Sequence, residues 1–400
     1  MPDSKRIRVQ DATLHKDGRM IRNYVHVFDK ELHKYFHTFQ FYTEYNRSVS
    51  KVPLSILNIP ALSAILPLAW ALGVNVEIDE LDETYYKGIE DARLINKANL
   101  FLSPLSFDTE LTAKKTVRNM FGFKGREGLF FSGGLDSIAS YLHRKPYASI
   151  LYWGYDIPLN WGSLWNRVKK EYRFVKPLLV KTNSLELYDN EELHNDIGSK
   201  LPVDLWSALA FSIHTFGVSA PLAVNRVDTL LMASTYPSRW LNHPDYTFLN
   251  RPQLYANQHL GFADVKTYDV EHEYNRVDKV KRIIKPHFEL EGYKTIRTCG
   301  HIELLRNRKH KELLNCCTCF KCLRTIGNLV VGGVDPNRCG FYVDEGTYRR
   351  IKSILTARIG NVKRIHAYWK PIKDAIPEKI VDDFCGSRKF LEWLRGYELV

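Results

Sequence analysis

Short apolar runs alternate with segments of helical spacing through the middle of the chain. The apolar runs are typical of strands buried on both faces of a sheet. Strands that alternate with helices predict a parallel sheet wound by right-handed crossovers. We therefore expect an α/β protein with a parallel doubly wound sheet. The expected strands lie at 129–131, 148–153, 178–181 and 227–234, and the expected helices at 138–143, 163–173 and 203–217.

The flanking parts of the chain show different patterns. Strands are expected at 24–28 and 39–45, and the alternation of apolar and acidic residues at 76–82 is that of a half-buried strand. The C-terminal part has helical spacing. The predicted domains are 1–125, an additional mixed α/β domain; 126–338, the central sheet domain; and 339–400, a helical extension with helices at 348–359 and 390–397.

One apolar stretch, at 53–74, is long enough to cross a bilayer. It contains Pro53, Pro60 and Pro67, and also polar residues, so we interpret it as buried helical pieces and expect no membrane span. The first ten residues are polar and basic, unlike a signal peptide. A cytoplasmic protein is therefore expected.

The chain is basic, with 57 Lys and Arg against 45 Asp and Glu in 400 residues, which gives a formal net charge of +12. An excess of this size favours polyanionic partners, although ATP alone accounts for part of it. The likeliest nucleic-acid surfaces are the basic segments 306–311 and 363–373. The second segment is equally typical of a solvated helix face. Nucleic-acid binding stays open at this point.

The strongest chemical pattern is the run Ser132-Gly133-Gly134-Leu135-Asp136-Ser137 between an expected strand and an expected helix. Its two glycines allow the backbone to approach an anion, and the helix N-terminus points N–H groups at the same place. The two serines add hydroxyl donors. An aspartate would repel a bare anion, so Asp136 indicates a bridging cation such as Mg²⁺. The run therefore predicts a phosphate site, against the alternative of an ordinary Gly-Gly turn.

Other phosphate and catalytic loops fit this run poorly. A P-loop needs a lysine after the second glycine, and none is present. A nucleophile elbow needs glycine two residues before the serine, where Phe130 stands. In parallel sheets, ligands bind at the carboxyl ends of strands. Adenine and ribose contacts are thus expected from neighbouring strand ends, although packing or turn roles are equally open for these residues: Trp153, Gly154, Tyr155, Thr182 and Asn183.

The cysteines form the second pattern. Five of the seven fall within 24 residues, and Cys316-x-x-Cys319-x-x-Cys322 with Cys299 upstream suits tetrahedral Zn²⁺. Four thiolates leave no position for a catalytic water, so the zinc is expected to be structural, with an iron–sulfur cluster as the alternative. Cys317 is interpreted as a neighbour of the site or as a replacement for Cys316. The remaining two, Cys339 and Cys385, are expected to be small buried side chains.

The run at Ser132 resembles the signature of the PP-loop ATP pyrophosphatases, which cleave ATP between the α and β phosphates. Together with the cysteines it resembles the 7-cyano-7-deazaguanine synthase family, over roughly residues 126 to 338. Asn315-Cys316-Cys317-Thr318-Cys319 and the residues to Thr325 are similar to the family's zinc motif, with Cys317 in place of glycine. Arg276 to Lys279 is similar to its basic phosphate segment. Tyr236-Pro237-Ser238-Arg239 is a weaker match to the stretch that contacts the base.

The resemblance implies a carbon–nitrogen ligase that adenylates a carboxylate, with 7-carboxy-7-deazaguanine as substrate and an amide or nitrile as product. The implied roles follow the family motifs. The pyrophosphate would lie on Ser132, Gly133, Gly134, Leu135 and Ser137, its Mg²⁺ on Asp136. Arg276 and Lys279 would offset phosphate charge, and Tyr236 and Arg239 would contact the substrate.

Two departures from the family widen the choice of partner. Sixteen residues, including the basic segment 306–311, separate Cys299 from Cys316, and about 125 residues precede the loop. Extended proteins of this kind resemble components of bacterial antiviral operons, which implies a protein or nucleic acid as amine acceptor. Two other hypotheses remain: a tRNA-thiolating enzyme, which needs a reactive cysteine outside the zinc set, and a non-catalytic ATP sensor. The oligomeric state is open, with a homodimer as one option.

Overall fold

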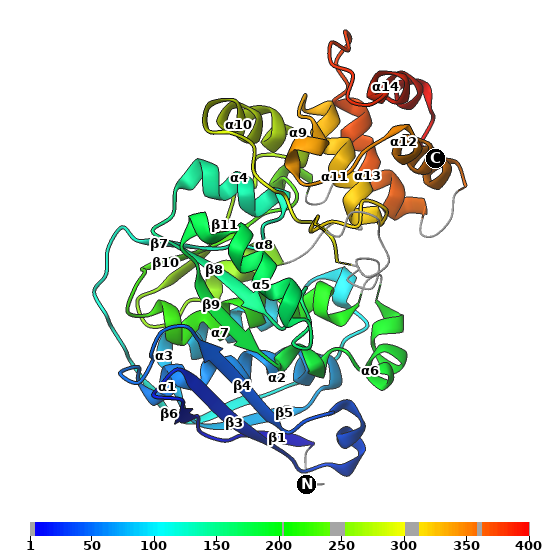
Figure 1. Cartoon of the computed structure of the whole chain (residues 1–400). Coiled ribbons are helices and arrows are strands. Elements are labelled where there is room, and N and C mark those ends of the chain that lie inside the picture. The colour runs from blue at the N-terminus through cyan, green and yellow to red at the C-terminus, as the bar shows by residue number, and fades with distance from the viewer. Residues whose placement is uncertain (1–4, 202–203, 241–252, 301–311, 358–361, 400) are drawn as a thin grey trace.

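The computed structural model arranges the chain in three tiers. Figure 1 shows the N-terminal strands at the bottom, the parallel strands in the middle and the C-terminal helices at the top. The structure describes all residues except 1–4, 202–203, 241–252, 301–311, 358–361 and 400.

Five parallel strands form the middle tier: β7 (Glu127–Phe130), β8 (Ala148–Trp153), β9 (Leu178–Thr182), β10 (Thr229–Ala233) and β11 (Lys266–Val270). Their order is β11-β10-β7-β8-β9, and every neighbouring pair among them is parallel. The chain therefore starts in the middle at β7, moves outward to β9, and then crosses back to β10. The position between β7 and β10 is the topological switch point of the sheet, where ligands bind in folds of this kind.

The N-terminal strands extend the same sheet beyond β9, so that it contains eleven strands. The junction is an antiparallel pairing of β4 with β9, and the order continues through β3, β1 and β5 to β6. The strands concerned are β1 (Arg6–Val9), β2 (Thr13–His15), β3 (Met20–Val27), β4 (Gln40–Tyr45), β5 (Asn75–Asp82) and β6 (Leu111–Val117).

The helices fall into sequence groups. Those of the N-terminal tier are α1 (Leu54–Leu57), α2 (Ile59–Leu72) and α3 (Glu83–Lys97). Those between and after the parallel strands are α4 (Leu135–Arg144), α5 (Gly162–Glu171), α6 (Glu191–Asp196), α7 (Phe211–Ala223), α8 (Gln253–Ala256), α9 (Arg276–Lys279) and α10 (Lys285–Glu291). The last group is α11 (Phe320–Val331), α12 (Glu345–Thr356), α13 (Val362–Asp374) and α14 (Ser387–Gly396).

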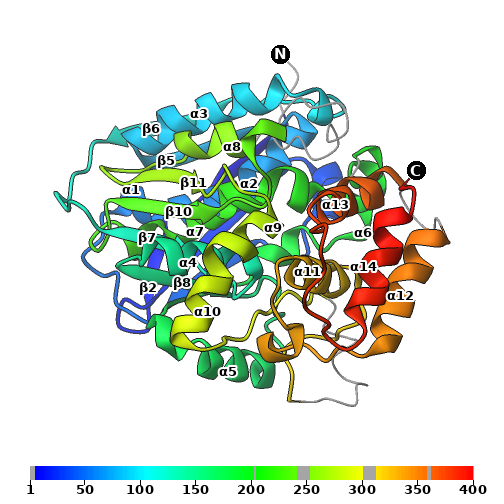
Figure 2. The ribbon, with the colours of Figure 1, turned by 90° about the horizontal axis from the view of Figure 1, so that it is seen from above.

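The parallel strands are buried on both faces, because successive side chains point to opposite sides of a sheet. Phe130 of β7 packs into one core together with α2, α7 and the N-terminal strands. Leu129, the preceding residue, packs into a second core with α4, α5 and the C-terminal helices. Figure 2 shows α11, α13 and α14 gathered on one side of the molecule, to the right of the strands. Helices thus cover both faces, and the sheet is doubly wound.

The expected α/β class with a largely parallel sheet is confirmed, and each strand and helix expected from the apolar pattern has a counterpart. The stretch at 53–74 forms the buried helices α1 and α2. Within the residues that the structure describes, no helix combines the length and apolar character that a bilayer crossing requires. The domain boundary at 125 stays a prediction. What the structure adds is that residues on its two sides share one sheet and one core.

Candidate functional site

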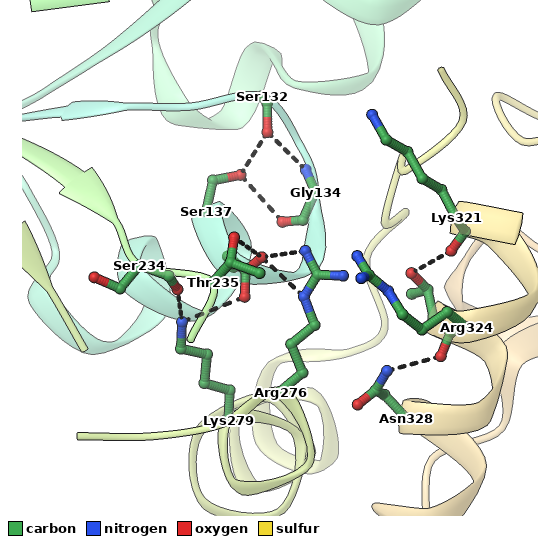
Figure 3. A network of polar contacts seen from close by, with 12 residues as sticks. Ser132, Gly134, Ser137, Ser234, Thr235, Arg276, Lys279, Lys321, Arg324 and Asn328 are labelled. Atoms are coloured by element: carbon green, nitrogen blue, oxygen red, sulfur yellow. Dashed lines mark hydrogen bonds and ion pairs between the residues drawn. The ribbon is translucent and has the colours of Figure 1, made fainter. Parts of the chain in front are cut away.

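The Ser132 loop lies at the switch point of the sheet. It joins the end of β7 to the start of α4, and the chain that leaves β10 passes beside it as Ser234 and Thr235. A polar network at this place links the loop to residues of α9 and of the segment after β10 (Figure 3). The fold alone would select this end of the strands as the place for a ligand.

The loop is held in a conformation that requires glycine. Gly133 has a φ of +78°, and a Cβ atom there would lie 2.3 Å from the ring of Tyr172. The Gly133 carbonyl oxygen accepts hydrogen bonds from the Arg297 N–H at 2.8 Å and from the Tyr172 hydroxyl at 3.3 Å. The backbone is therefore fixed from outside the loop, by residues far away in sequence.

The two serines close the loop on itself. Ser137 Oγ donates to the Gly134 carbonyl oxygen at 3.0 Å, and the Oγ atoms of Ser132 and Ser137 are 3.3 Å apart. Gly134 is the N-cap of α4, and within the described residues no side chain caps that helix. The first N–H groups of an uncapped helix attract anions through their partial positive charge. The loop therefore has the geometry of a phosphate site.

Asp136, in the first turn of α4, is almost enclosed by cations. Its Oδ2 accepts from Arg276 Nη2 at 2.5 Å and Nε at 3.0 Å, and its Oδ1 accepts from Lys279 Nζ at 3.3 Å. Lys279 is fully buried and also donates to the Ser234 carbonyl oxygen. Burial alone would raise the pKa of the Asp136 carboxyl, but Arg276 and Lys279 outweigh it and hold the pKa at about 2. The sequence-predicted residues Asp136, Arg276 and Lys279 thus form one charged group.

The four predicted cysteine ligands come together. The Sγ atoms of Cys299, Cys316, Cys319 and Cys322 all lie within 4.8 Å of one another, and all four residues are buried. The Cys316 and Cys322 sulfurs are 3.9 Å apart. Tetrahedral Zn²⁺ with bonds near 2.3 Å puts its sulfurs roughly 3.8 Å apart, so the group fits such an ion. Cys317 lies outside the group.

Hydrogen bonds around the cysteines strengthen this fit. The Cys319 N–H donates to Cys316 Sγ at 3.3 Å, and the Thr318 hydroxyl donates to the same sulfur at 3.5 Å. Donors of this kind stabilise thiolate ligands. Cys317 has a φ of +59°, in the left-handed region that favours glycine, and its sulfur accepts from the Tyr342 N–H at 3.2 Å. The metal site is therefore supported with the ligand set that leaves Cys317 out.

The amide of Asn315 ties the cysteine group to the phosphate loop. Its Oδ1 accepts from the Thr298 and Cys299 N–H groups at 2.8 and 3.3 Å, and its Nδ2 donates to the Ile296 carbonyl oxygen at 2.7 Å. These bonds fix the segment that contains Arg297, whose N–H contacts Gly133. The cysteine group is thus linked to the Ser132 loop through Asn315 and the backbone of residues 296–299.

Two buried arginines near the loop have donor atoms without a partner. Arg297 is 5% exposed, and its Nε and Nη2 have no hydrogen-bond partner in the part of the chain that the structure describes. Arg324 is 8% exposed, and its Nε is likewise unpartnered. Figure 3 shows the Arg324 guanidinium directed toward that of Arg276. Burial lowers the pKa of Arg324, and the positive charge of Arg276 lowers it further.

The predicted substrate residues separate in the structure. Tyr236 stacks on Tyr368 of α13, with ring centroids 6.2 Å apart, and Tyr368 lies under the Arg324 guanidinium at 4.1 Å. Tyr236 therefore borders the site. Arg239 instead donates to the Glu273 carbonyl oxygen at 2.6 Å and contacts Asp278, and its side chain is 56% exposed. Arg239 therefore stabilises the backbone around α9 through these contacts.

The candidates at the ends of β8 and β9 have structural partners. Gly154 has a φ of +102°, and a Cβ there would lie 1.9 Å from the Thr182 carbonyl oxygen, so only glycine allows this close approach. Thr182 Oγ1 donates to the Tyr42 carbonyl oxygen at 3.0 Å, and Asn183 Oδ1 accepts from the Tyr42 N–H at 2.9 Å. Trp153 stacks on Trp165 at 5.7 Å. These residues hold β8, β9 and β4 together, and their predicted nucleotide contacts remain predictions.

Two acidic residues at the end of β11 were not expected from the sequence. Asp269 accepts a hydrogen bond from Asn257 at 2.7 Å, and burial raises its pKa to about 7. Glu271 is buried, has a φ of +51° and accepts a hydrogen bond from Ser140 of α4. Glu271 therefore anchors α4, while Asp269 is a carboxyl that exchanges a proton near neutral pH. A group with such a pKa is suited to general base catalysis.

Other expectations have mixed outcomes. Leu135 packs its side chain in the second core and offers the site only its backbone. Cys339 is buried as expected, whereas the prediction for Cys385 was wrong, because the short loop before α14 leaves that residue exposed. The basic segment 306–311 lies outside the described residues. The sequence missed Arg297, Arg324, Asp269 and Tyr368, although Arg324 follows the last metal ligand by two residues.

Comparison with known proteins adds no identification: no family model, curated protein or solved structure matches the chain.

Proposed function

We propose that the protein is an ATP pyrophosphatase that adenylates a carboxylate and transfers the acyl group to an amine. The observation that carries the proposal is the Ser132–Ser137 loop at the switch point of the sheet, with the uncapped N-terminus of α4 faced by Arg276 and Lys279. A loop of glycines and hydroxyls with two cations is suited to a phosphate chain. Asp136 is suited to a divalent cation on it.

The chemistry assigns each group a task. A substrate carboxylate oxygen attacks the α-phosphorus of ATP, the bond to the bridging oxygen of the β-phosphate breaks, and pyrophosphate leaves with the bonding electrons. The α4 N-terminus, Ser132 and Ser137 would bind that pyrophosphate, and Arg276 and Lys279 would offset its charge. An amine then attacks the acyl carbon, AMP leaves and the amine nitrogen loses a proton. That proton can pass to solvent.

Charge exchange at Asp136 would accompany ATP binding. In the ligand-free protein the Asp136 carboxylate neutralises Arg276 and Lys279. Phosphate oxygens compete for the same cations, and Mg²⁺ bound to the phosphates would attract the freed carboxylate. The resemblance to the synthase family makes 7-carboxy-7-deazaguanine the first substrate to test. Ammonia, a protein amine and a nucleic-acid amine are the acceptors to compare.

The thiolase hypothesis finds less support in the cysteines. A sulfur carrier needs an accessible thiolate. Cys339 is fully buried, and burial raises its pKa to about 12. Cys317 is buried beside the metal ligands, and Cys385, which is exposed, lies in the C-terminal extension. Ligase chemistry needs none of these residues.

Isotope labelling gives the sharpest test. The metal-loaded protein is incubated with Mg-ATP, ammonium and 7-carboxy-7-deazaguanine labelled with ¹⁸O in the carboxylate, and the products are separated by mass. An acyl-adenylate leaves one labelled oxygen in AMP when the amine displaces it. Asp136→Ala should abolish AMP formation, and Asp108→Ala, at an exposed aspartate of the N-terminal tier, should not. Formation of ADP, or of AMP without label, would rule out the adenylate.

A further inference from the structure

The cations around the loop are neutralised unequally. Arg276 and Lys279 share the carboxylate of Asp136. Among the residues that the structure describes, Arg297 reaches one acidic group, Asp156, at 3.9 Å, and the Asp156 side chain is 58% exposed. Arg324 has an aromatic ring beneath it, and the cation Arg276 in front of it.

Leaving such groups unpaired is costly. A buried guanidinium that lacks hydrogen-bond acceptors loses hydration and gains little in return. Two like charges directed at each other add repulsion. Folded proteins keep such arrangements where a ligand later supplies the missing acceptors. The position of both arginines next to one loop indicates that one ligand serves both.

Both arginines lie on the open side of the loop. The Arg297 main chain bonds to Gly133, and its guanidinium reaches toward Asp156 after β8, so it lies across the ends of β7 and β8. Arg324 projects from α11 toward Arg276 of α9 (Figure 3). Arg297 and Arg324 thus reach the loop from segments other than α9, which carries Arg276 and Lys279.

The charge count fits a polyphosphate. Arg276, Lys279, Arg297 and Arg324 bring four positive charges to the loop, and Asp136 is the one buried carboxylate paired with them in the described structure. A net excess of this size exceeds what one carboxylate ligand would neutralise. A chain of two or three phosphates supplies enough charge and enough acceptor oxygens for all four.

We propose that Arg297 and Arg324 are anion ligands that complete a polyphosphate site together with Arg276 and Lys279. The inference rests on the proposed function for the source of the polyphosphate, namely ATP. Arg297 precedes the metal ligand Cys299 by two residues and Arg324 follows Cys322 by two. A metal held by Cys299, Cys316, Cys319 and Cys322 would fix the backbone beside both arginines before the ligand arrives, and would so preorganise the site.

The test is the binding of inorganic tripolyphosphate to the metal-loaded protein by isothermal titration calorimetry, which needs no catalysis. Arg297→Met and Arg324→Met should each weaken binding by about 10- to 100-fold, the loss of charge-assisted hydrogen bonds. Arg226→Met is the matched control. Arg226 lies just before the first residue of β10, at the other end of the strand from the loop, and donates to Leu222 and Asn225. The Arg226→Met substitution removes the same charge and should leave tripolyphosphate binding within about twofold of the wild type.

A second readout separates ligand binding from structural support. If the arginines await an anion, their replacement by an apolar side chain relieves an unpaired charge, so the melting temperature of the ligand-free protein stays level or rises. Metal content, measured by mass spectrometry, stays unchanged. The inference fails if the wild type does not bind tripolyphosphate, if both variants bind it normally, or if weaker binding comes with lower melting temperature and lost metal. If both arginine variants lose tripolyphosphate binding as expected but the wild type forms no AMP, the proposed function alone would be contradicted.

Discussion

Buried positive charge is neutralised to different degrees on the two sides of the Ser132 loop. On the carboxylate side, formed by Asp136, Arg276 and Lys279, cations and anion neutralise each other inside the protein. On the cysteine side, formed by Arg297, Arg324 and the four cysteines, three buried guanidinium nitrogens lack a hydrogen-bond acceptor within the described residues. Ion pairs inside the protein stabilise the carboxylate side, whereas on our proposal a bound anion stabilises the cysteine side.

On our proposal, the difference gives a reason for a possible metal site beside the Ser132 loop. A self-neutralised group keeps its geometry because its ion pairs hold it. Unpaired guanidiniums would move apart or turn toward solvent unless the backbone that carries them were fixed. Asn315 and the cysteine group provide that fixation. Metal removal and charge removal should therefore act on the two sides differently.

The largest effect is expected from loss of the metal. Cys322→Ser removes a fully buried ligand, and because structural zinc contributes on the order of 10 kcal/mol in small domains, the variant should unfold far below the wild-type melting temperature. Tripolyphosphate binding should be lost as well. Calorimetry measures the melting temperature and the binding of tripolyphosphate, and mass spectrometry measures the metal content. Cys385→Ser, at an exposed cysteine, is the control and should change neither. A Cys322→Ser protein with full metal content would contradict the ligand assignment.

The carboxylate side is broken by Asp136→Asn. The change leaves Arg276 and Lys279 buried without their counter-charge, which costs about 3 to 5 kcal/mol for an ion pair that loses one partner. Urea unfolding measures the loss. Added tripolyphosphate should recover part of the stability, because it supplies negative charge to the same cations. Asp156→Asn, at an exposed carboxylate 3.9 Å from Arg297, should change stability by less than about 0.5 kcal/mol. Equal losses in both variants would erase the distinction between the two sides.

Asp269 offers a comparison within the carboxylates. Its pKa is raised to about 7 by burial, so the folded state keeps a proton that the unfolded state releases above pH 4. Its contribution to stability is therefore present below pH 4 and is lost as pH rises through 7. Asp269→Asn should raise stability at pH 8 by a few kcal/mol and have little effect at pH 4. The free energy of unfolding of the wild type and of Asp269→Asn is measured at pH 4 and at pH 8. An equal effect of the substitution at both pH values would rule out the raised pKa.

Asp136 gives the opposite dependence. Its pKa is lowered to about 2, so its contribution is present above pH 4 and is lost as pH falls through 2. The size is about 2 kcal/mol, from a shift of nearly two pKa units. The wild type should lose that amount relative to Asp136→Asn between pH 4 and pH 2. Parallel stability curves for the two proteins would show that Asp136 is not ion-paired in solution.

The sequence predicted the carboxylate side well and the cysteine side in part. Strands β7 to β10, the loop and the four metal ligands follow from apolar runs and motif spacing, which are local signals. Arg276 and Lys279 came from a resemblance. Arg297 could not be found in this way, because its burial and its bond to Gly133 depend on chain segments 164 residues apart, brought together only by the fold. An unpaired charge has no sequence signature.

The sheet beyond β9 was missed for the same reason. Strands at 39–45 and 178–181 were expected separately, but nothing in either segment specifies that they pair. Thr182 and Asn183, which we interpreted as candidate nucleotide residues, have their polar atoms on Tyr42 of β4. A polar residue at a strand end has the same appearance in sequence whether it binds a ligand or a neighbouring strand.

The pairing of β4 with β9 also determines when this part of the sheet can form during translation. The Tyr42 N–H and the Asn183 side chain that bonds to it are 141 residues apart. At a translation rate of about 5 to 20 residues per second, β4 waits roughly 10 to 30 seconds for its partner to leave the ribosome. During that interval the edge of β4 that pairs with β9 lacks its partner strand. The nascent chain is therefore most exposed to aggregation before β9 emerges, and chaperone contact should concentrate in that window.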